Sequence, residues 1–316
     1  MKTNKLYKYI NLLIRILIGL AAIWYIYIKL NDSFIFNLQQ FNIDNISYRF
    51  IIIALLLVIL NWGIEAIKWR YAIRNIVGLP ILKAFKHTIT GITLGLVTPN
   101  RIGEIPARAL LLNNNSFKEI TLKTAVASFS QVLITLLIGG IGFAITYKQF
   151  NLGQNSILLN FVILFSSLIL VLLYFRVNNL GRVLNKIKYI REKELVNALS
   201  EFEYNELVNI LMFSLLRYIV FSIQFWLVLK AFDISLTTFD DVLLIPICFM
   251  IASFIPTILI SEIGVRGSVA LFVFGTVSNM DIQIILSSVL LWFINVALPA
   301  LIGLINLNDL KILKEK

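Results

Sequence analysis

The chain has 316 residues, of which 59% are hydrophobic, and its mean hydropathy is +0.87. Such values lie outside the range of soluble globular domains, so we predict an all-α polytopic membrane protein. A single cysteine, Cys248, excludes an internal disulfide and a zinc cluster, and a single histidine, His87, argues against a metal site. We expect neither a metal nor a cofactor.

Six apolar runs are long enough to cross a bilayer as helices. They cover residues 9–28, 50–67, 124–147, 156–175, 207–229 and 282–307. Two further apolar stretches, residues 87–112 and 242–274, are divided by proline, glycine and charged residues into shorter legs. We therefore predict two re-entrant helical hairpins, or eight crossing segments if the hairpin legs span the bilayer.

The chain carries 28 Lys and Arg against 17 Asp and Glu. With the predicted spans, 19 of these cations fall on one side of the membrane and four on the other. The positive-inside rule makes the richer side cytoplasmic and places both termini there, in the cytoplasmic membrane. Orientation explains the basic excess, so no nucleic-acid partner is expected.

Residues 176–206 form the longest basic segment, with apolar residues at helical spacing. We interpret it as an amphipathic cytoplasmic connector that rests on acidic lipid headgroups. An ordinary solvated connector is the alternative.

The single domain, residues 1–316, divides into two similar halves, residues 9–147 and 156–307. Corresponding spans and hairpin tips, the latter placed near residues 101 and 263, are offset by about 147 to 162 residues. The first half starts inside and the second outside, which predicts an inverted-topology repeat of the kind that transporters use.

The two hairpin tips carry residues suited to a lipid headgroup. Arg101 and Arg266 are expected to bind the headgroup phosphate, and Glu104 and Glu262 to balance them in its absence. The alternative is that the four side chains are buried ion pairs that only fix the packing of the hairpins. The residues expected to shape the hairpin backbone and let it approach a ligand are Pro99, Asn100, Gly103, Gly264 and Gly267.

Glu65 and Arg217 lie inside predicted spans and are candidates to line the headgroup path. The alternative for both is a structural ion pair or a backbone cap. The sequence contains no GxSxG motif, zinc-ligand pair or phosphate-binding P-loop, so we predict no catalytic residues and a transporter rather than an enzyme.

The segments TPNRIGEIPARALLL (98–112) and SEIGVRGSVALFVFG (261–275) resemble the lysylphosphatidylglycerol synthase transmembrane-region, or flippase-like, family. Pro99, Arg101, Gly103 and Glu104 match its Pro-Gly-Arg-x-Gly-Glu motif, with Asn100 in place of a glycine. The second segment keeps a Gly-Val-Arg core. Its acidic residue, however, precedes the core, where the family commonly has Pro-Gly-Gly before the core and Glu after it.

The resemblance implies translocation of membrane lipids, which we expect to be anionic phospholipids or phosphate-linked glycolipids. The soluble domain that performs aminoacyl transfer in some relatives is expected to be absent. Two alternatives stay open: a membrane subunit of aminoacyl-phosphatidylglycerol synthesis that needs a separate transferase, and a non-transporting scaffold of an envelope glycan pathway. A homo-oligomer or an envelope-biogenesis partner is compatible with all three.

Overall fold

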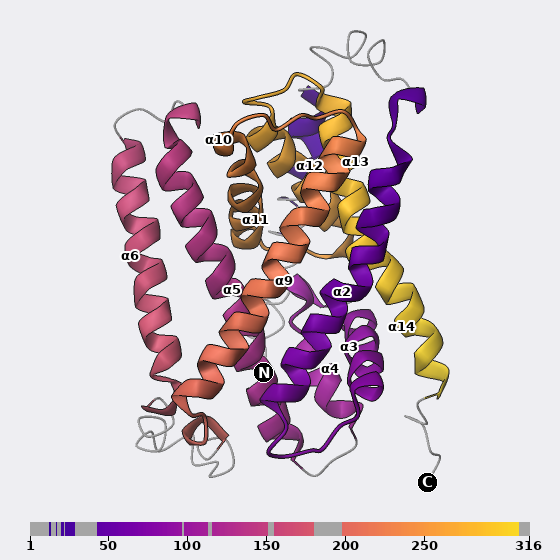
Figure 1. Ribbon diagram of the computed structural model, residues 1–316, viewed down its shortest axis with the longest axis vertical. Coiled ribbons are helices and arrows are strands. Elements are labelled where there is room, and N and C mark those ends of the chain that lie inside the picture. The colour runs from indigo at the N-terminus through magenta and orange to yellow at the C-terminus, as the bar shows by residue number, and fades with distance from the viewer. Residues whose placement is uncertain are drawn as a thin grey trace.

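The computed structural model describes residues 43–96, 98–112, 116–150, 155–179 and 198–309, together with residues 13, 17, 20, 21 and 23–28. Every regular element in this part of the chain is helical (Figure 1). The predicted first span, residues 9–28, is described only in part, and the middle of the predicted basic connector, residues 180–197, lies outside the described residues.

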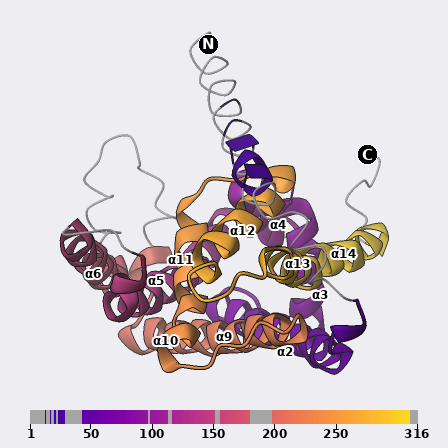
Figure 2. The same cartoon turned by 90° about the horizontal axis from the view of Figure 1, so that it is seen from above.

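Five helical segments are long and apolar enough to cross a membrane. They are α2 (Tyr48–Ala72), α5 (Phe117–Thr146), α6 (Asn155–Phe175), α9 (Tyr204–Ala231) and a continuous run of α13 (Asp281–Trp292), the π-helical η4 (Phe293–Ala297) and α14 (Leu298–Asp309). These helices confirm the second to sixth predicted spans. Their outer faces are apolar, and α6 lies at the margin of the bundle beside α5 (Figure 2).

The helices are longer than the hydropathy runs that predicted them. The second run was expected to end at residue 67, but α2 continues to Ala72. The extra turn keeps Lys68 inside the helix, where it is fully buried. Lys68 is one of the 19 cations that the positive-inside count places on the cytoplasmic side, and the structure buries it inside the protein instead.

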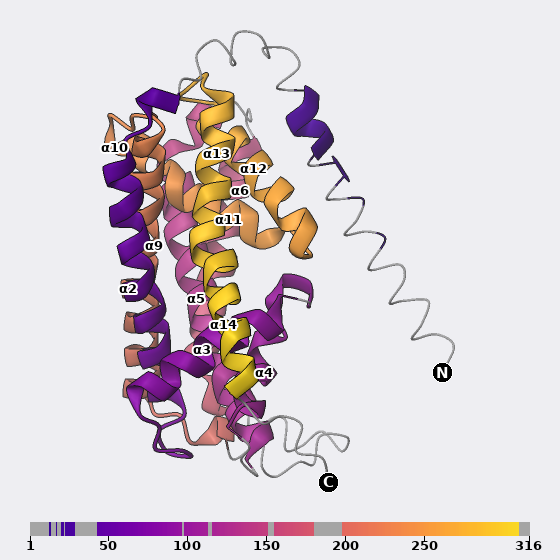
Figure 3. The same ribbon diagram turned by 90° about the vertical axis from the view of Figure 1, so that its right-hand side faces the viewer.

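Two pairs of shorter helices occupy the predicted hairpin regions. The first pair is α3 (Ile81–Gly95) and α4 (Glu104–Leu110), joined through the 3-10 turn η2 (Pro99–Arg101). The second pair is α11 (Leu244–Phe254) and α12 (Leu259–Phe274), preceded by the short α10 (Phe239–Val242). The two pairs lie in opposite halves of the molecule (Figure 3). Two more 3-10 turns, η1 (Ile43–Asn45) and η3 (Tyr147–Phe150), complete the described elements.

The second tip lies earlier in the chain than predicted. α11 ends before Pro256, because a residue that precedes proline is pushed out of the helical region, and Ile255 is accordingly extended, with φ −88° and ψ 116°. The tip is thus residues 255–258, not a turn near residue 263. Gly264 and Gly267 lie inside α12 and do not shape the tip.

Close helix contacts hold the hairpins against the long helices. α2 packs along α9, α3 packs on α14, and α11 packs on α5. Glycines permit the last two contacts: a Cβ added at Gly303 would lie 2.6 Å from the Ile89 carbonyl oxygen, and one at Gly139 would lie 2.4 Å from the Met250 Cβ. Gly139 therefore serves close helix packing.

Candidate functional site

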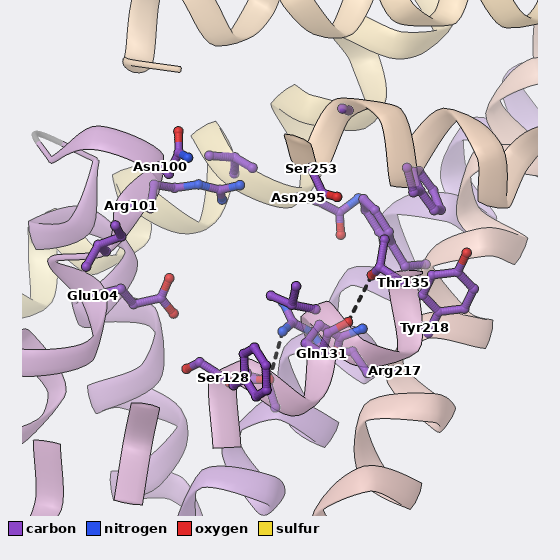
Figure 4. Close-up of a pocket in the computed structure, with 18 of the residues that line it drawn as sticks. Asn100, Arg101, Glu104, Ser128, Gln131, Thr135, Arg217, Tyr218, Ser253 and Asn295 are labelled. Atoms are coloured by element: carbon purple, nitrogen blue, oxygen red, sulfur yellow. Dashed lines mark hydrogen bonds and ion pairs between the residues drawn. The ribbon is translucent and has the colours of Figure 1, made fainter. Parts of the chain in front are cut away.

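A cavity of about 700 Å³ lies where the two hairpin tips meet the long helices (Figure 4). Its walls come from α2, α5, α9 and η4, and from both hairpins. All four predicted headgroup residues line it, as do both candidates for the headgroup path. These six residues are Arg101, Glu104, Glu262, Arg266, Glu65 and Arg217.

The two tips contact each other through one backbone–backbone hydrogen bond and one backbone–side-chain hydrogen bond. The Asn100 N–H donates to the Thr257 carbonyl oxygen at 3.0 Å, and the Thr257 N–H donates to Asn100 Oδ1 at 2.6 Å. Asn100 and Arg101 both have positive φ, 49° and 56°, which turns the chain toward the partner tip. The contact joins residues more than 150 positions apart in the sequence.

The first tip is closed by a compact polar turn after Pro99. Thr98 Oγ1 donates to the Gly95 carbonyl at 2.6 Å and accepts from the Gly103 N–H at 2.8 Å. A Cβ at Gly103 would lie 2.5 Å from Thr98 Cγ2, so only glycine fits there. The role predicted for Gly103 in hairpin backbone geometry agrees with this contact.

Glu262 joins the hairpins by accepting hydrogen bonds from Arg101 and Arg266, which are called the tip arginines because they lie at or near the two tips. Arg266, one helical turn away on α12, donates at 2.8 Å, and Arg101 of the first hairpin donates at 3.1 Å. The Glu262 side chain is 8% exposed, whereas the arginines are 23% and 24% exposed and line the cavity. One buried carboxylate therefore serves two cations that keep access to the cavity.

Glu104, which was predicted to balance the arginines, forms its ion pair with Arg108 four residues later on α4. This spacing places both side chains on one face of a helix, so the local partner prevails over the tip arginine. Arg108 also donates to Glu65 of α2 at 2.9 Å. Glu262 is thus the ion-pair partner of both Arg101 and Arg266, whereas Glu104 forms its ion pair with Arg108.

Glu65 is the centre of a second charged cluster. Its carboxylate lies 2.7 Å from Lys68 Nζ and accepts from Arg217 at 2.7 Å, besides the contact from Arg108. The Glu65 and Arg108 side chains are each 3% exposed, and Arg217 is 19% exposed. Glu65 and Arg217 therefore form the ion pair that was the alternative reading, and they also line the cavity.

Uncharged polar groups extend this cluster across α2, α9 and η4. Asn61 accepts from Arg217 Nε at 3.0 Å and donates to Asn295 Oδ1 at 2.7 Å. The Asn295 carbonyl, which Pro299 cannot bond because proline has no N–H, accepts from the Trp62 indole at 3.1 Å. The Arg217 guanidinium lies 4.5 Å from the centre of the Trp62 ring.

Sequence reasoning missed Lys68 and Arg108 as members of this site. The signal was present, because Lys68 follows Glu65 by three positions and Arg108 follows Glu104 by four, the spacings at which helical side chains meet. Among the described residues, no group of three or more His, Cys, Asp or Glu side chains is placed to hold a metal ion.

The family model described as Lysylphosphatidylglycerol synthase TM region matches residues 12–303. The chain belongs to this family. Together with the long apolar helices, membership in the lysylphosphatidylglycerol synthase TM region family identifies a multi-pass membrane protein with a role related to membrane lipids. No curated protein and no solved structure matches the chain.

Proposed function

We propose that this protein is a transporter that moves an anionic phospholipid or a phosphate-linked glycolipid between the leaflets of the cytoplasmic membrane. One observation carries the proposal: a cavity with eight charged side chains lies between two hairpin tips, inside a bundle with apolar outer faces. Ionisable groups at such a depth are rare unless they pair or bind a substrate.

An inverted-topology repeat, with both termini cytoplasmic, is part of this proposal. The starts of corresponding helices support it, since α9 begins 156 residues after α2, α11 163 after α3, α12 155 after α4 and α13 164 after α5. Packing supports it as well, because the contact of α3 with α14 has its counterpart in the contact of α11 with α5. α2 and α9 are corresponding helices of the two halves, and they pack against each other.

The proposal treats both hairpins as re-entrant. Their helices have 15, 7, 11 and 16 residues, fewer than the roughly 20 that cross a bilayer. Irregular backbone at membrane depth requires burial in protein or a wet cavity, and residues of both tips line the cavity. Transporters commonly bind substrates between such broken helices.

The tip arginines supply the recognition chemistry. Arg101 and Arg266 share Glu262, so a phosphate that enters the cavity can take guanidinium donors without leaving the carboxylate unpaired. The Glu65 cluster then offers Arg217 further along the same cavity. A headgroup crosses the midplane by passing from one set of cations to the other.

A reconstituted lipid-movement assay tests the proposal. Proteoliposomes with headgroup-labelled anionic lipid are compared for wild type and the double variant Arg101→Gln/Arg266→Gln, which removes both positive charges and keeps polar side chains with N–H donors. We expect at least a tenfold slower exchange between leaflets in the double variant. The control is Arg49→Gln, since Arg49 is exposed and distant from the cavity lining. Equal rates for the double variant and wild type would overturn the proposal.

A further inference from the structure

We infer that the headgroup accepted by the cavity carries two negative charges, as a lipid phosphate monoester or a lipid-linked sugar diphosphate does. This inference rests on the proposed function and makes its substrate class more specific. It sets these lipids apart from phosphodiester lipids with one negative charge and from aminoacylated lipids with a net positive charge.

The first observation is the charge of the cavity wall. Three carboxylates line the cavity, and five cations line it with them. The carboxylates belong to Glu65, Glu104 and Glu262. The cations are Lys68, Arg101, Arg108, Arg217 and Arg266. The described lining therefore holds an excess of two positive charges.

The second observation is how this excess is distributed. In the tip cluster, the single carboxylate of Glu262 serves Arg101 and Arg266, which leaves one positive charge. In the inner cluster, Glu65 and Glu104 serve three cations, which again leaves one. Each of the two clusters thus needs one further negative charge.

The third observation is that two buried cations keep unused donors. Lys68 Nζ has three N–H groups and its one ion pair is with Glu65 at 2.7 Å, and Arg108 Nε has no hydrogen-bond partner among the described residues. Both side chains are at least nine-tenths buried and line the cavity. Buried polar groups are normally satisfied, so these donors favour an absent anion as their partner.

Electrostatics then ranks the headgroups. Charges in a partly desolvated cavity interact far more strongly than in water, so unneutralised cations are unfavourable there. A headgroup of charge −2 neutralises both clusters, one of charge −1 leaves one cluster unpaired, and a cationic headgroup adds to the excess. Two phosphates, or one doubly ionised phosphate, match the pattern best.

Binding to the purified full-length chain tests the inference. Native mass spectrometry compares lipids of four headgroup classes: phosphatidic acid, prenyl diphosphate-linked N-acetylglucosamine, phosphatidylglycerol and lysylphosphatidylglycerol. We expect the first two to bind at least tenfold more tightly than phosphatidylglycerol, and lysylphosphatidylglycerol to bind most weakly. The first two arms also separate the monoester from the diphosphate, and inorganic diphosphate serves as a probe without a lipid tail.

The variant Arg266→Gln provides the internal check. It removes the excess cation of the tip cluster and leaves Arg101 and Glu262 as a balanced pair. The preference for doubly charged lipids is expected to fall at least threefold, whereas Arg49→Gln keeps it. Thermal unfolding of each variant establishes that it is folded.

The possible results separate the inference from the proposed function. Equal binding of all headgroups, tighter binding of phosphatidylglycerol, or inorganic diphosphate binding as tightly as the lipids overturns the inference, while leaflet exchange is judged in its own assay. Charge-ranked binding without leaflet exchange of any lipid supports the inference and overturns the transporter.

Discussion

Asn100 illustrates how one side chain meets two demands at the first tip. Its φ of 49° lies in the left-handed region, which glycine and asparagine tolerate and most residues avoid. The family motif that this segment resembles has glycine at this position. Asparagine keeps the conformation and adds an acceptor, Oδ1, that binds the Thr257 N–H of the other tip.

Substitutions at Asn100 separate these two roles. Asn100→Gly and Asn100→Ala both lose the Oδ1 acceptor of the Thr257 N–H, but only alanine places a Cβ at positive φ. We expect the glycine variant to be more stable than the alanine variant by about 1–2 kcal/mol. The midpoint of thermal unfolding in detergent measures this difference.

Asn209 provides the matched control for that comparison. It lies within α9 at an ordinary helical φ, so there the alanine variant is expected to be the more stable one. If Asn100 gave the same order as Asn209, the left-handed conformation at the first tip would be wrong.

Helix contacts explain why α14 and α3 lie so close. A Cβ at Gly303 would approach Thr93 Oγ1 to 2.3 Å, and Thr93 donates to the Ala300 carbonyl at 2.8 Å. In the same way, Gly139 and Gly142 of α5 allow the close contact with α11 of the second hairpin. Small residues at helix interfaces let two backbones approach each other closely. This packing matters in membranes because the hydrophobic effect does not drive helices together there.

Gly303→Ala is expected to force α14 away from α3 and to destabilise the protein by about 1–3 kcal/mol. The measurement is again the thermal unfolding midpoint. Gly63→Ala is the matched control, because Gly63 lies in the middle of α2 with nothing within 4 Å of an added Cβ. That control is expected to unfold at the wild-type temperature or above it. Wild-type stability of Gly303→Ala would contradict the close contact.

The helices themselves were largely predictable from the sequence. Hydropathy located five spans, because in a bilayer each helix must be apolar over about 20 residues whatever its neighbours are. The helix ends were harder to predict. α2 extends beyond its apolar run because Lys68 can stay in the helix when Glu65, one turn earlier, neutralises it.

For the molecule as a whole, the positive-inside count already indicated most of the cations of the site. Assigning cations to the two sides left five arginines inside apolar segments: Arg15, Arg101, Arg108, Arg217 and Arg266. The last four all line the cavity. What the sequence could not supply was the pairing across 43 to 161 positions that makes Glu65 and Glu262 the shared carboxylates.

The meeting of the tips suggests that substrate movement requires them to separate. A cysteine pair, Asn100→Cys with Thr257→Cys in a Cys248→Ala background, places thiols where the two backbones are already hydrogen-bonded. Oxidation is expected to slow leaflet exchange at least tenfold, and reduction to restore it, because a disulfide holds both hairpins at their contact. Each single-cysteine variant shows whether the substitution alone has an effect.

A second cysteine pair distinguishes tip separation from a general loss of flexibility. Ser47 donates its N–H to the Ala231 carbonyl at 2.9 Å, at the end of the molecule where α2 begins and α9 ends. Because α2 and α9 pack along each other, a disulfide between Ser47→Cys and Ala231→Cys is expected to leave exchange unchanged. Unchanged exchange with the tips cross-linked would mean that headgroups cross without opening them, and the path would then have to run along α5 and α9 instead.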